Sequence, residues 1–244
     1  MITEKLLIRV KGASTVTVLT GAGISAESGV PTFRGKDGLW NNQQFEELAN
    51  ISTFEHEPQK FWDFYNWRRE KLKNIKPNLG HFALVDFERH FSEFHLITQN
   101  VDNLHRVAGS KHILELHGNL NRNRCSQCSA IEEHGSAKIK VPKCQKCGGN
   151  MRPDVVLFGE SLNQEILREA QEASASCEVF FSIGTSGLVE PAASLPYLAK
   201  ANGAYLVEIN EEDTPLTPNV SESIRGPSGK ILPRLAILFD KLFT

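Results

Sequence analysis

The chain has 244 residues, 40% of them apolar, and its 27 basic and 29 acidic residues give a formal net charge of -2. The length suits one α/β domain with an insertion, and the apolar content is enough for a substantial core. The near balance of charge excludes a global field that would draw the protein to nucleic acid or to an anionic membrane.

The N-terminal segment, Met1 to Ala13, has charged residues within its apolar stretch and no small-residue cleavage site. Nowhere does the sequence contain about 18 consecutive apolar residues, the length typical of a membrane-spanning helix. We therefore expect a cytoplasmic protein that does not contact a membrane, with a first helix that caps the fold.

The first predicted strand, Thr15 to Leu19, leads directly into a glycine-rich turn. Gly21, Gly23 and Ala26 fit the G-x-G-x-x-G/A pattern of a strand-to-helix junction that binds a dinucleotide. The first glycine permits the tight turn, the second lets the backbone approach a pyrophosphate, and the alanine lets the helix pack close to the strand. A dinucleotide is therefore the first candidate ligand, held at free N–H groups of the helix start.

The residues after this turn differ from those of an ordinary dehydrogenase. A dehydrogenase would continue into a second strand ending in an acidic residue about 20 residues on, which holds the adenosine ribose. Here Pro31 ends any helix early, and a polar loop carrying Phe33 and Arg34 follows. We expect this loop to cover the ligand.

The next segment, residues 41–76, lacks strand character. A helix is predicted to begin near Pro58, a favoured first-turn residue, and its apolar residues cover much of its circumference. Such a helix suits a position between two bodies of the protein. A further helix is predicted over Leu79 to Phe91.

Polar side chains follow the next predicted strand, Phe94 to Thr98, in the order Gln99, Asn100 and Asp102. In open α/β sheets, ligands bind beyond the carboxyl ends of the strands. These amides and this carboxylate are therefore candidates for binding ribose or nicotinamide groups, although Asn and Asp also end strands as simple turns.

The strand predicted over Ile113 to Leu116 delivers His117 to the same kind of position. A lone histidine is more often structural. At a strand end beside a dinucleotide site, however, a side chain with an ordinary pKa of about 6.5 can act as a general base near neutral pH. The other seven histidines have no such setting in the sequence.

Four cysteines form two C-x-x-C pairs, Cys125 with Cys128 and Cys144 with Cys147. Each pair places two thiolates on one turn, and together they complete the tetrahedron that zinc prefers. A reducing cytoplasm disfavours disulfides. Since four thiolates leave no position for water or substrate, we expect a structural zinc ion that folds residues 120–150 as a small ribbon.

Strands and helices alternate in the rest of the chain, which predicts a parallel, doubly wound sheet. The fifth cysteine, Cys177, ends one of these helices and is expected to be a buried apolar residue. The predicted elements are strand Val155 to Phe158, helix Asn163 to Ala175, strand Val179 to Ile183, helix Pro191 to Ala201, strand Tyr205 to Ile209 and helix Leu232 to Phe243.

Two of these strands end in residues that suit a ligand. Gly184 allows close backbone approach, and Thr185 and Ser186 offer hydroxyl groups. Asn210 can hold the adenosine ribose in place of the missing acidic residue. The glycine- and proline-containing loop around Ser228 is of the same type.

Together, these motifs resemble those of sirtuins, the NAD-dependent protein lysine deacylases. GAGISAESGVPTFR, the strand end QNVD, ELHGN, the double C-x-x-C, and GTS followed by a strand ending in asparagine occur in the sirtuin order. The resemblance runs from about Val16 to the C-terminus. It implies an α/β fold, with a Rossmann-like doubly wound parallel sheet and a smaller lobe made of a zinc ribbon and a helical module.

The resemblance also implies where the domains lie. Residues 1–40, 77–119 and 151–244 would form the Rossmann-like NAD-binding domain. The helical module, 41–76, and the zinc ribbon, 120–150, would form the small domain, with NAD in the cleft between the two.

The site residues implied by the resemblance fall into three groups. His117 is the catalytic base. Backbone groups of a short segment would pair with an extended substrate peptide, as in β-strand addition; its residues are Val155, Val156, Leu157, Phe158 and Gly159. The implied NAD contacts are Gly21, Ala22, Gly23, Phe33, Arg34, Gln99, Asn100, Asp102, Gly184, Thr185, Ser186, Asn210 and Ser228.

The implied reaction uses NAD as a co-substrate and acylated-lysine proteins as partners. The acyl-lysine amide oxygen attacks C1′ of the nicotinamide ribose, and nicotinamide leaves. His117 deprotonates a ribose hydroxyl so that the acyl group can migrate to the sugar. The products would be free lysine, nicotinamide and O-acyl-ADP-ribose.

The identity of the acyl group is indicated by Tyr65 and Arg68, which share one face of the helix after Pro58. By periodicity alone, Tyr65 would pack in the core and Arg68 would reach solvent. They also resemble the Tyr-x-x-Arg motif of the sirtuin class that removes succinyl and malonyl groups, and Ala49 aligns with a small residue that widens the acyl pocket. A guanidinium can receive an acyl carboxylate bidentately. We therefore expect succinyl and malonyl substrates, together with acetyl.

Three other functions are considered. A dehydrogenase would account for the glycine turn but lacks the second-strand acidic residue. A protein ADP-ribosyltransferase is a closer rival, because the same C1′ chemistry serves it. A zinc-ribbon nucleic-acid module is suggested by the basic residues of the ribbon, among them Arg122 and Arg124, but leaves His117 unexplained. We expect no specific nucleic-acid partner.

Overall fold

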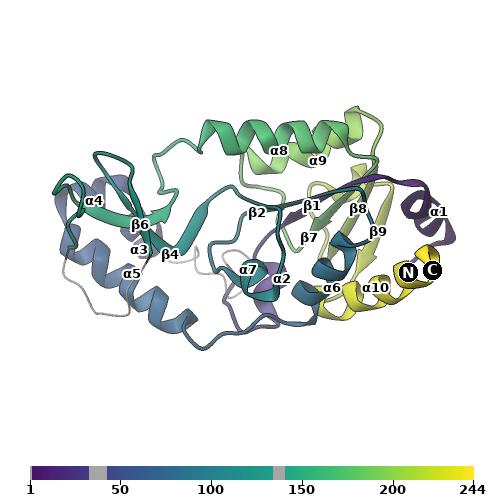
Figure 1. Ribbon diagram of the computed structural model, residues 1–244, viewed down its shortest axis with the longest axis horizontal. Coiled ribbons are helices and arrows are strands. Elements are labelled where there is room, and N and C mark those ends of the chain that lie inside the picture. The colour runs from purple at the N-terminus through teal and green to yellow at the C-terminus, as the bar shows by residue number, and fades with distance from the viewer. Residues whose placement is uncertain (1, 33–42, 134–140) are drawn as a thin grey trace.

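The computed structural model describes residues 2–32, 43–133 and 141–244. Within them the chain forms two sheets, connected by helices and loops (Figure 1). Parallel strands make up the larger sheet, in the order β3-β2-β1-β7-β8-β9, and an antiparallel sheet has the order β5-β4-β6. The chain runs outward from β1 in one direction and from β7 in the other, which is the Rossmann order. The predicted fold class is confirmed.

The larger sheet consists of β1 (Thr15–Thr20), β2 (Glu93–Thr98), β3 (Ile113–Glu115), β7 (Val179–Ile183), β8 (Tyr205–Asn210) and β9 (Glu222–Arg225). The smaller sheet consists of β4 (Gly118–Cys125), β5 (Ile131–Glu133) and β6 (Met151–Val155). The α-helices are α1 (Glu4–Gly12), α2 (Gly23–Ala26), α3 (Gln43–Leu48), α4 (Ile51–His56), α5 (Pro58–Leu72), α6 (Leu79–Glu88), α7 (Leu104–Ala108), α8 (Gln164–Ser176), α9 (Leu195–Ala201) and α10 (Ser228–Phe243). Two 3-10 turns, η2 (Ala192–Ser194) and η3 (Thr217–Asn219), complete the described elements.

Helices cover both faces of the larger sheet (Figure 1). Helices α8 and α9 lie over one face, and α1, α6 and α10 over the other. Because successive residues of a strand point to opposite faces, Phe180 of β7 packs toward α8 and α9 while Phe181 meets Phe87 of α6 and Phe239 of α10. Burial on both faces explains why these strands are apolar throughout.

The smaller sheet has its own core at the other end of the molecule (Figure 1). Trp62 and Tyr65 of α5 pack there with Leu120 of β4 and Met151 of β6. The indole N–H of Trp62 donates to the Met151 carbonyl at 3.2 Å, which fixes α5 against this sheet. The predicted helix start at Pro58 is confirmed.

The prediction that Val155 to Phe158 form a strand of the parallel sheet is wrong. β6 ends at Val155 and pairs antiparallel with β4, and beyond it the Phe158 N–H donates to the Ala49 carbonyl at 3.0 Å. The segment is apolar because Val155 and Leu157 are buried in the core of the smaller sheet. Periodicity cannot distinguish that burial from a central parallel strand.

Other elements also differ from the prediction. Helix α6 ends at Glu88 and not at Phe91, and the helix predicted from Pro191 is divided into η2 and α9. The final helix begins at Ser228 and not at Leu232, because the Glu27 carboxylate accepts the Gly229 N–H at 2.6 Å and so satisfies the helix start from a distant segment. The edge strand β9 was not predicted, because it is short and partly polar. The predicted first helix, packed through Leu6 and others, is confirmed, as is the burial of Cys177.

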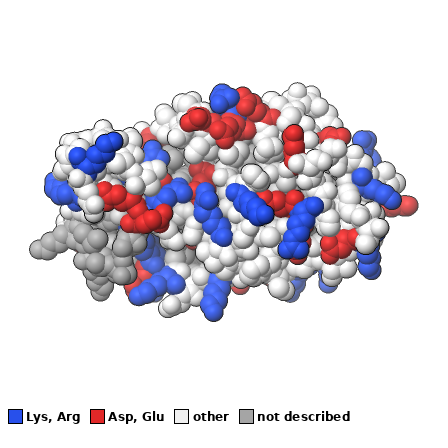
Figure 2. Space-filling model, viewed as in Figure 1, with Lys and Arg blue, Asp and Glu red and all other residues white. Residues whose placement is uncertain are grey.

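Basic and acidic side chains are interspersed over the face seen in Figure 2, as the balanced composition predicts. Among the described residues, no helix is both long enough and apolar enough to cross a membrane.

Candidate active site

The carboxyl ends of the parallel strands open onto a cavity of about 930 Å³. It extends from the turns after β1 and β7 to α5 and the segment beyond β6. Ligands of open α/β sheets bind beyond these strand ends, so the cavity is the candidate active site. The predicted site residues that line it are Gly21, Ala22, Gly23, Ala49, Tyr65, Arg68, Gln99, Asn100, His117, Val155, Val156, Leu157, Phe158, Gly159, Gly184, Thr185, Ser186, Asn210 and Ser228.

Three predicted NAD contacts are not among these lining residues. Phe33 and Arg34 lie outside the described residues, so their position over the ligand stays a prediction. Asp102 is not among the lining residues, and its carboxylate accepts the Ser25 hydroxyl at 2.7 Å and the Leu104 N–H at 2.9 Å. Burial raises the pKa of Asp102, although these two hydrogen bonds oppose the shift by lowering it. Asp102 therefore links α2 to the start of α7, and its contact with NAD stays a prediction.

Gly23 and Gly184 bring the turns after β1 and β7 into direct contact. The Gly23 N–H donates to the Gly184 carbonyl at 2.8 Å, and a Cβ on Gly23 would lie 2.6 Å from the Gly184 Cα. Gly184 also has a φ of 58°, a region that favours glycine. These glycines are thus required by the contact between the turns as well as by any ligand, a role the sequence did not reveal.

His117 is oriented by a neighbouring strand end. Its Nδ1 lies 3.0 Å from the Gln99 carbonyl oxygen, and because a carbonyl only accepts, Nδ1 must carry the proton. The neutral ring therefore has an unprotonated Nε2, the form required of a general base. Burial lowers the pKa of His117, although the bond to Gln99 opposes this shift, so the neutral form predominates at pH 7.

Gln99 is itself fixed on both sides. Its backbone N–H donates to the Thr20 carbonyl at 3.0 Å, and its side-chain amide donates to the Thr185 hydroxyl at 2.8 Å. The orientation of the imidazole is thereby tied to β1 and to the turn after β7.

Two buried histidines beneath the cavity were missed by the sequence analysis. The rings of His81 and His105 lie with their centroids 4.9 Å apart. His81 Nδ1 accepts the Asn78 N–H at 3.3 Å, so Nε2 carries the proton of the neutral ring and donates it to the Ser25 hydroxyl oxygen at 3.4 Å. Burial lowers the pKa of His81 to about 4. Burial also lowers the pKa of His105, and the neighbouring His81 lowers it further. The only sequence signal was the helix-capping spacing of Asn78 and His81.

The far end of the cavity is formed by α5. Tyr65 is 1% exposed, and burial raises its pKa to about 12. Arg68 follows it on the same helical face, with its guanidinium carbon 5.8 Å from the centre of the Tyr65 ring. Burial lowers the pKa of Arg68, while the Tyr65 hydroxyl and the Asp102 carboxylate raise it. A cation and a phenol therefore share this wall with Ala49.

Backbone N–H groups of the segment beyond β6 are already hydrogen-bonded within the protein. The Val156 N–H donates to the His117 carbonyl at 3.0 Å, and the Phe158 N–H donates to Ala49. The Leu157 N–H donates to the Glu160 carboxylate at 2.9 Å. Because these N–H groups are already engaged, a substrate peptide would have to pair with other backbone groups of this segment, and this pairing stays a prediction.

Asn210 and Ser228 brace the other end of the cavity. The Asn210 side-chain amide donates to the Thr185 carbonyl at 2.9 Å, and the Ser228 hydroxyl lies 3.5 Å from the Gly23 carbonyl oxygen. Contact of either side chain with a dinucleotide stays a prediction.

The four cysteines meet in the smaller sheet, with all their sulfur atoms within 4.8 Å of one another. The Sγ atoms of Cys125 and Cys147 are 3.5 Å apart, and those of Cys128 and Cys144 are 3.7 Å apart. A zinc ion bound tetrahedrally at about 2.3 Å requires sulfur separations close to these. Backbone N–H groups also donate to several of the sulfurs, as from Gly149 to Cys147 at 3.4 Å, so the donors fit a structural zinc ion.

The fold and the cavity define a Rossmann-type α/β protein with a ligand-sized cavity at its strand ends and a second lobe that carries four clustered cysteines. Comparisons with known proteins identify its family. The Sir2 family profile matches residues 21–191. NAD-dependent protein deacylase 1 of Archaeoglobus fulgidus is 47% identical over 234 residues, which cover 95% of this chain and 96% of that protein.

Solved structures agree. A complex of a Sir2 homologue with NAD superposes with a TM-score of 0.93 at 44% identity, covering 100% of this chain and 96% of the other. A Sir2 mutant bound to a deacetylated p53 peptide and 3′-O-acetyl-ADP-ribose gives a TM-score of 0.85 at 30% identity, covering 100% of both chains. The chain belongs to the Sir2 family, the sirtuins.

The cysteine geometry predicts one zinc ion per chain. Cys128→Ser should lose the zinc ion and lower the thermal midpoint, because the metal contributes folding energy. Cys177→Ala, which alters a cysteine buried elsewhere, should keep the zinc ion. Metal analysis of the purified proteins checks both expectations, and a zinc-free wild-type chain would contradict the assignment.

The buried histidines predict a loss of stability in acid. A histidine with a lowered pKa binds fewer protons folded than unfolded, so the free energy of unfolding should fall as the pH drops below about 6.5, by up to about 1.4 kcal/mol per pH unit for each histidine. For His81 this contribution should end near its folded pKa of about 4. Urea unfolding of wild type, His81→Gln and the exposed control His112→Ala from pH 7 to pH 5 measures it.

Compared with wild type, His81→Gln should take up about one proton fewer on unfolding, so its stability should fall less steeply as the pH drops. A wild-type stability that is constant over this pH range would refute the assignment of buried, neutral histidines.

Proposed function

We propose that the protein is an NAD-dependent protein-lysine deacylase that removes succinyl and malonyl groups and also acetyl groups. The observation that carries this proposal is the setting of His117, whose protonated Nδ1 faces the Gln99 carbonyl at 3.0 Å. Its ring lines one cavity together with the glycine turns and with Arg68. A base, a dinucleotide site and an acyl-binding end are therefore combined in one space.

The residues of this cavity fit NAD as a co-substrate. Its volume of about 930 Å³ is at the upper end of the usual range for ligand pockets. The turns at Gly21 and Gly184 bring backbone to its wall, and Asn100 and Thr185 offer polar groups there. When bound, NAD would supply the ribose carbon that takes up the acyl-lysine amide oxygen as nicotinamide leaves.

His117 would act after that substitution. Its unprotonated Nε2 would accept the proton of a ribose hydroxyl, which can then take the acyl group, while the bond from Nδ1 to Gln99 steadies the ring and stabilises the positive charge it gains. With one water molecule from the solvent consumed as the lysine amine leaves the acyl carbon, free lysine, nicotinamide and O-acyl-ADP-ribose would result. The related structure that holds a deacetylated peptide and an acetyl-ADP-ribose supports this outcome.

The negatively charged acyl groups are proposed from the other end of the cavity. A succinyl-lysine brings a carboxylate that must leave water, and the Arg68 guanidinium beside the Tyr65 hydroxyl can replace the lost hydrogen bonds. Ala49 keeps its neighbouring wall free of a bulky side chain. An acetyl group gains nothing from either polar residue, so Arg68 should discriminate between the acyl groups.

Proteins with acylated lysines are the proposed partners, consistent with the p53 peptide in the related complex. The nucleic-acid alternative is weakened, because Arg122 and Arg124 form ion pairs with Asp154 and are not free to bind phosphates. The domain boundaries and the cytoplasmic location stay predictions.

The products formed from NAD and an acyl-peptide distinguish the candidate functions. Nicotinamide release that depends on the peptide would support a deacylase, and NADH absorbance would indicate a dehydrogenase. ADP-ribose attached to protein would indicate a transferase.

His117→Ala should lower deacylation by about 100-fold to 10,000-fold, the usual effect of losing a general base. The fold should remain, since His117 lies at a strand end facing the cavity. Rates on an acyl-peptide are compared with those of the exposed control His112→Ala, which should match wild type. Near-normal turnover by a folded His117→Ala protein would remove this residue from the mechanism.

Arg68→Met should raise the KM for a succinyl-peptide by about 10- to 150-fold, equivalent to roughly 1.5 to 3 kcal/mol for a hydrogen bond to a charged group. Acetyl-peptide turnover should change much less. Both acyl groups are assayed on one peptide sequence, with Lys71→Met as the matched control because Lys71 is exposed on the same helix. Equal losses on the two substrates would assign Arg68 to folding.

A further inference from the structure

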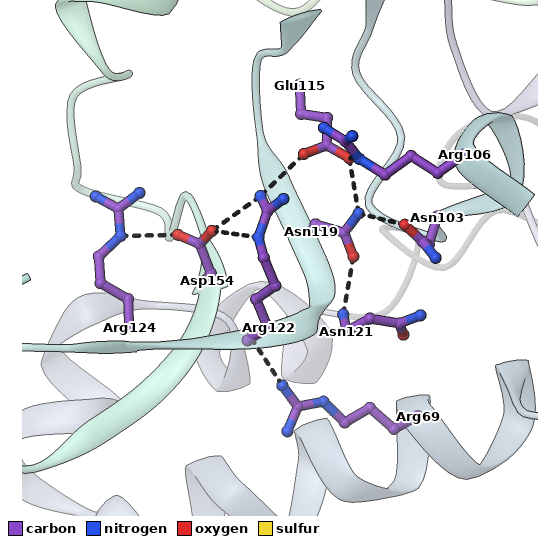
Figure 3. Close-up of polar contacts among 9 residues, drawn as sticks. All are labelled: Arg69, Asn103, Arg106, Glu115, Asn119, Asn121, Arg122, Arg124 and Asp154. Atoms are coloured by element: carbon purple, nitrogen blue, oxygen red, sulfur yellow. Dashed lines mark hydrogen bonds and ion pairs between the residues drawn. The ribbon is translucent and has the colours of Figure 1, made fainter. Parts of the chain in front are cut away.

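The turn that carries His117 is braced by a polar network that the proposed reaction does not use (Figure 3). At its centre is Asn119, which is 2% exposed. Its side-chain amide donates to the Asn103 side-chain oxygen at 2.8 Å and to the Glu115 carboxylate at 2.7 Å, and its oxygen accepts the Asn121 N–H at 2.9 Å. All the hydrogen-bonding groups of this carboxamide are directed within the protein.

Glu115 and Asn119 stand on either side of His117 in the sequence, at the end of β3 and near the start of β4. Their hydrogen bond therefore closes the turn that presents the imidazole. At the centre of that turn, Gly118 has a φ of 81°, and a Cβ there would lie 2.0 Å from the Asp154 carbonyl oxygen. The turn thus depends on a residue with no side chain of its own to stiffen it.

Glu115 is a fixed anchor for this bond. It is 7% exposed and forms ion pairs with Arg106 of α7 and Arg122 of β4, both at 2.9 Å. Burial alone would raise its pKa, but the hydrogen bonds from Arg106 and Asn119 and the charge of Arg122 lower it. Arg122 also pairs with Asp154 of β6 at 3.0 Å, so the anchor extends into the smaller sheet (Figure 3).

Asn103 connects the network to the segment that contains Gln99. Asn103 precedes α7 in a left-handed conformation, with a φ of 68°, and its side chain does not cap that helix. It accepts from Asn119 instead. The Asn103–Asn119 bond therefore links the segment that bears Gln99 to the turn that bears His117. The Gln99 carbonyl oxygen and His117 Nδ1 lie 3.0 Å apart.

We propose that Asn119 is a positioning residue for His117: its carboxamide ties the turn between β3 and β4 to Asn103, and so holds the imidazole against the Gln99 carbonyl. Backbone hydrogen bonds also hold this turn, such as that from the Val156 N–H to the His117 carbonyl at 3.0 Å and that from the Leu120 N–H to the Val101 carbonyl at 2.9 Å. The bond from Asn119 to Asn103 adds a side-chain link between the turn and the segment that follows Gln99. A displacement of about 1 Å at a reacting group can cost about 100-fold in rate. This inference rests on the proposed role of His117 as base.

The test separates the two halves of the proposed reaction. Nicotinamide leaves before the base acts, so exchange of labelled nicotinamide into NAD, measured with acyl-peptide present, does not require His117. Asn119→Ala should lower the kcat of deacylation by about 10- to 100-fold, with the exchange rate and the KM values within about twofold of wild type. Asn121→Ala is the matched control, since Asn121 is exposed on the same strand, and should behave as wild type.

A second variant tests the same hydrogen bond independently, in case Asn119→Ala does not fold. Asn103→Gly removes the other partner and suits the left-handed backbone, so it should fold and show the same selective loss of deacylation. The double variant should lose no more than Asn119→Ala alone, because both changes break one link. Equal losses of exchange and deacylation, normal deacylation by Asn119→Ala, or independent losses in the double variant would overturn the proposal. If wild type deacylates and His117→Ala does not, these outcomes leave the proposed function intact.

Discussion

The contact between Gly23 and Gly184 is the constraint on which the site depends. The strand order reverses between β1 and β7, so the connections that leave these two strands diverge to opposite faces of the sheet and open a crevice. The turns touch at the bottom of that crevice through a backbone hydrogen bond of 2.8 Å, at a separation that admits no Cβ on either residue. A side chain there would separate β1 from β7 and with them the residues at their ends. The glycines are thus required in the first place for the two turns to pack together. Because they carry no side chains, their backbone is also accessible to a ligand.

The second half of the site is attached to this crevice by hydrogen bonds from the smaller sheet. Arg69, next to Arg68 on α5, donates from Nε to the Leu120 carbonyl at 2.7 Å and from its terminal nitrogen to the Asn123 side-chain oxygen at 2.8 Å. Since β4 begins directly after His117, these bonds help to set the distance between α5, which carries Arg68, and His117. The position of Arg68 relative to His117 is therefore fixed in part by its buried neighbour Arg69, which joins the two proposed ends of the site.

Local chemistry decided which features the sequence could predict. The cysteine spacing and the glycine turn each require particular residue types at particular positions, so the zinc site and the first strand-end turn follow from the sequence alone. His117 was identified because its strand was distinct. The strand over Val155 to Phe158 was misassigned, because an apolar run does not reveal which core it enters. The bond between Ser25 and Asp102 and the pairing of the buried histidines join distant segments, and no local pattern encodes them.

The central claim is that one cavity brings an acylated lysine and NAD together so that the acyl amide oxygen itself attacks the ribose. The most direct test uses an acyl-peptide whose amide oxygen is ¹⁸O, with unlabelled NAD and water. Mass spectrometry locates the label after the acyl group has been removed from the product sugar. The label should stay with ADP-ribose, because the amide oxygen becomes bonded to C1′. Label that leaves with the acyl group, as in direct attack by water on the amide, would contradict it.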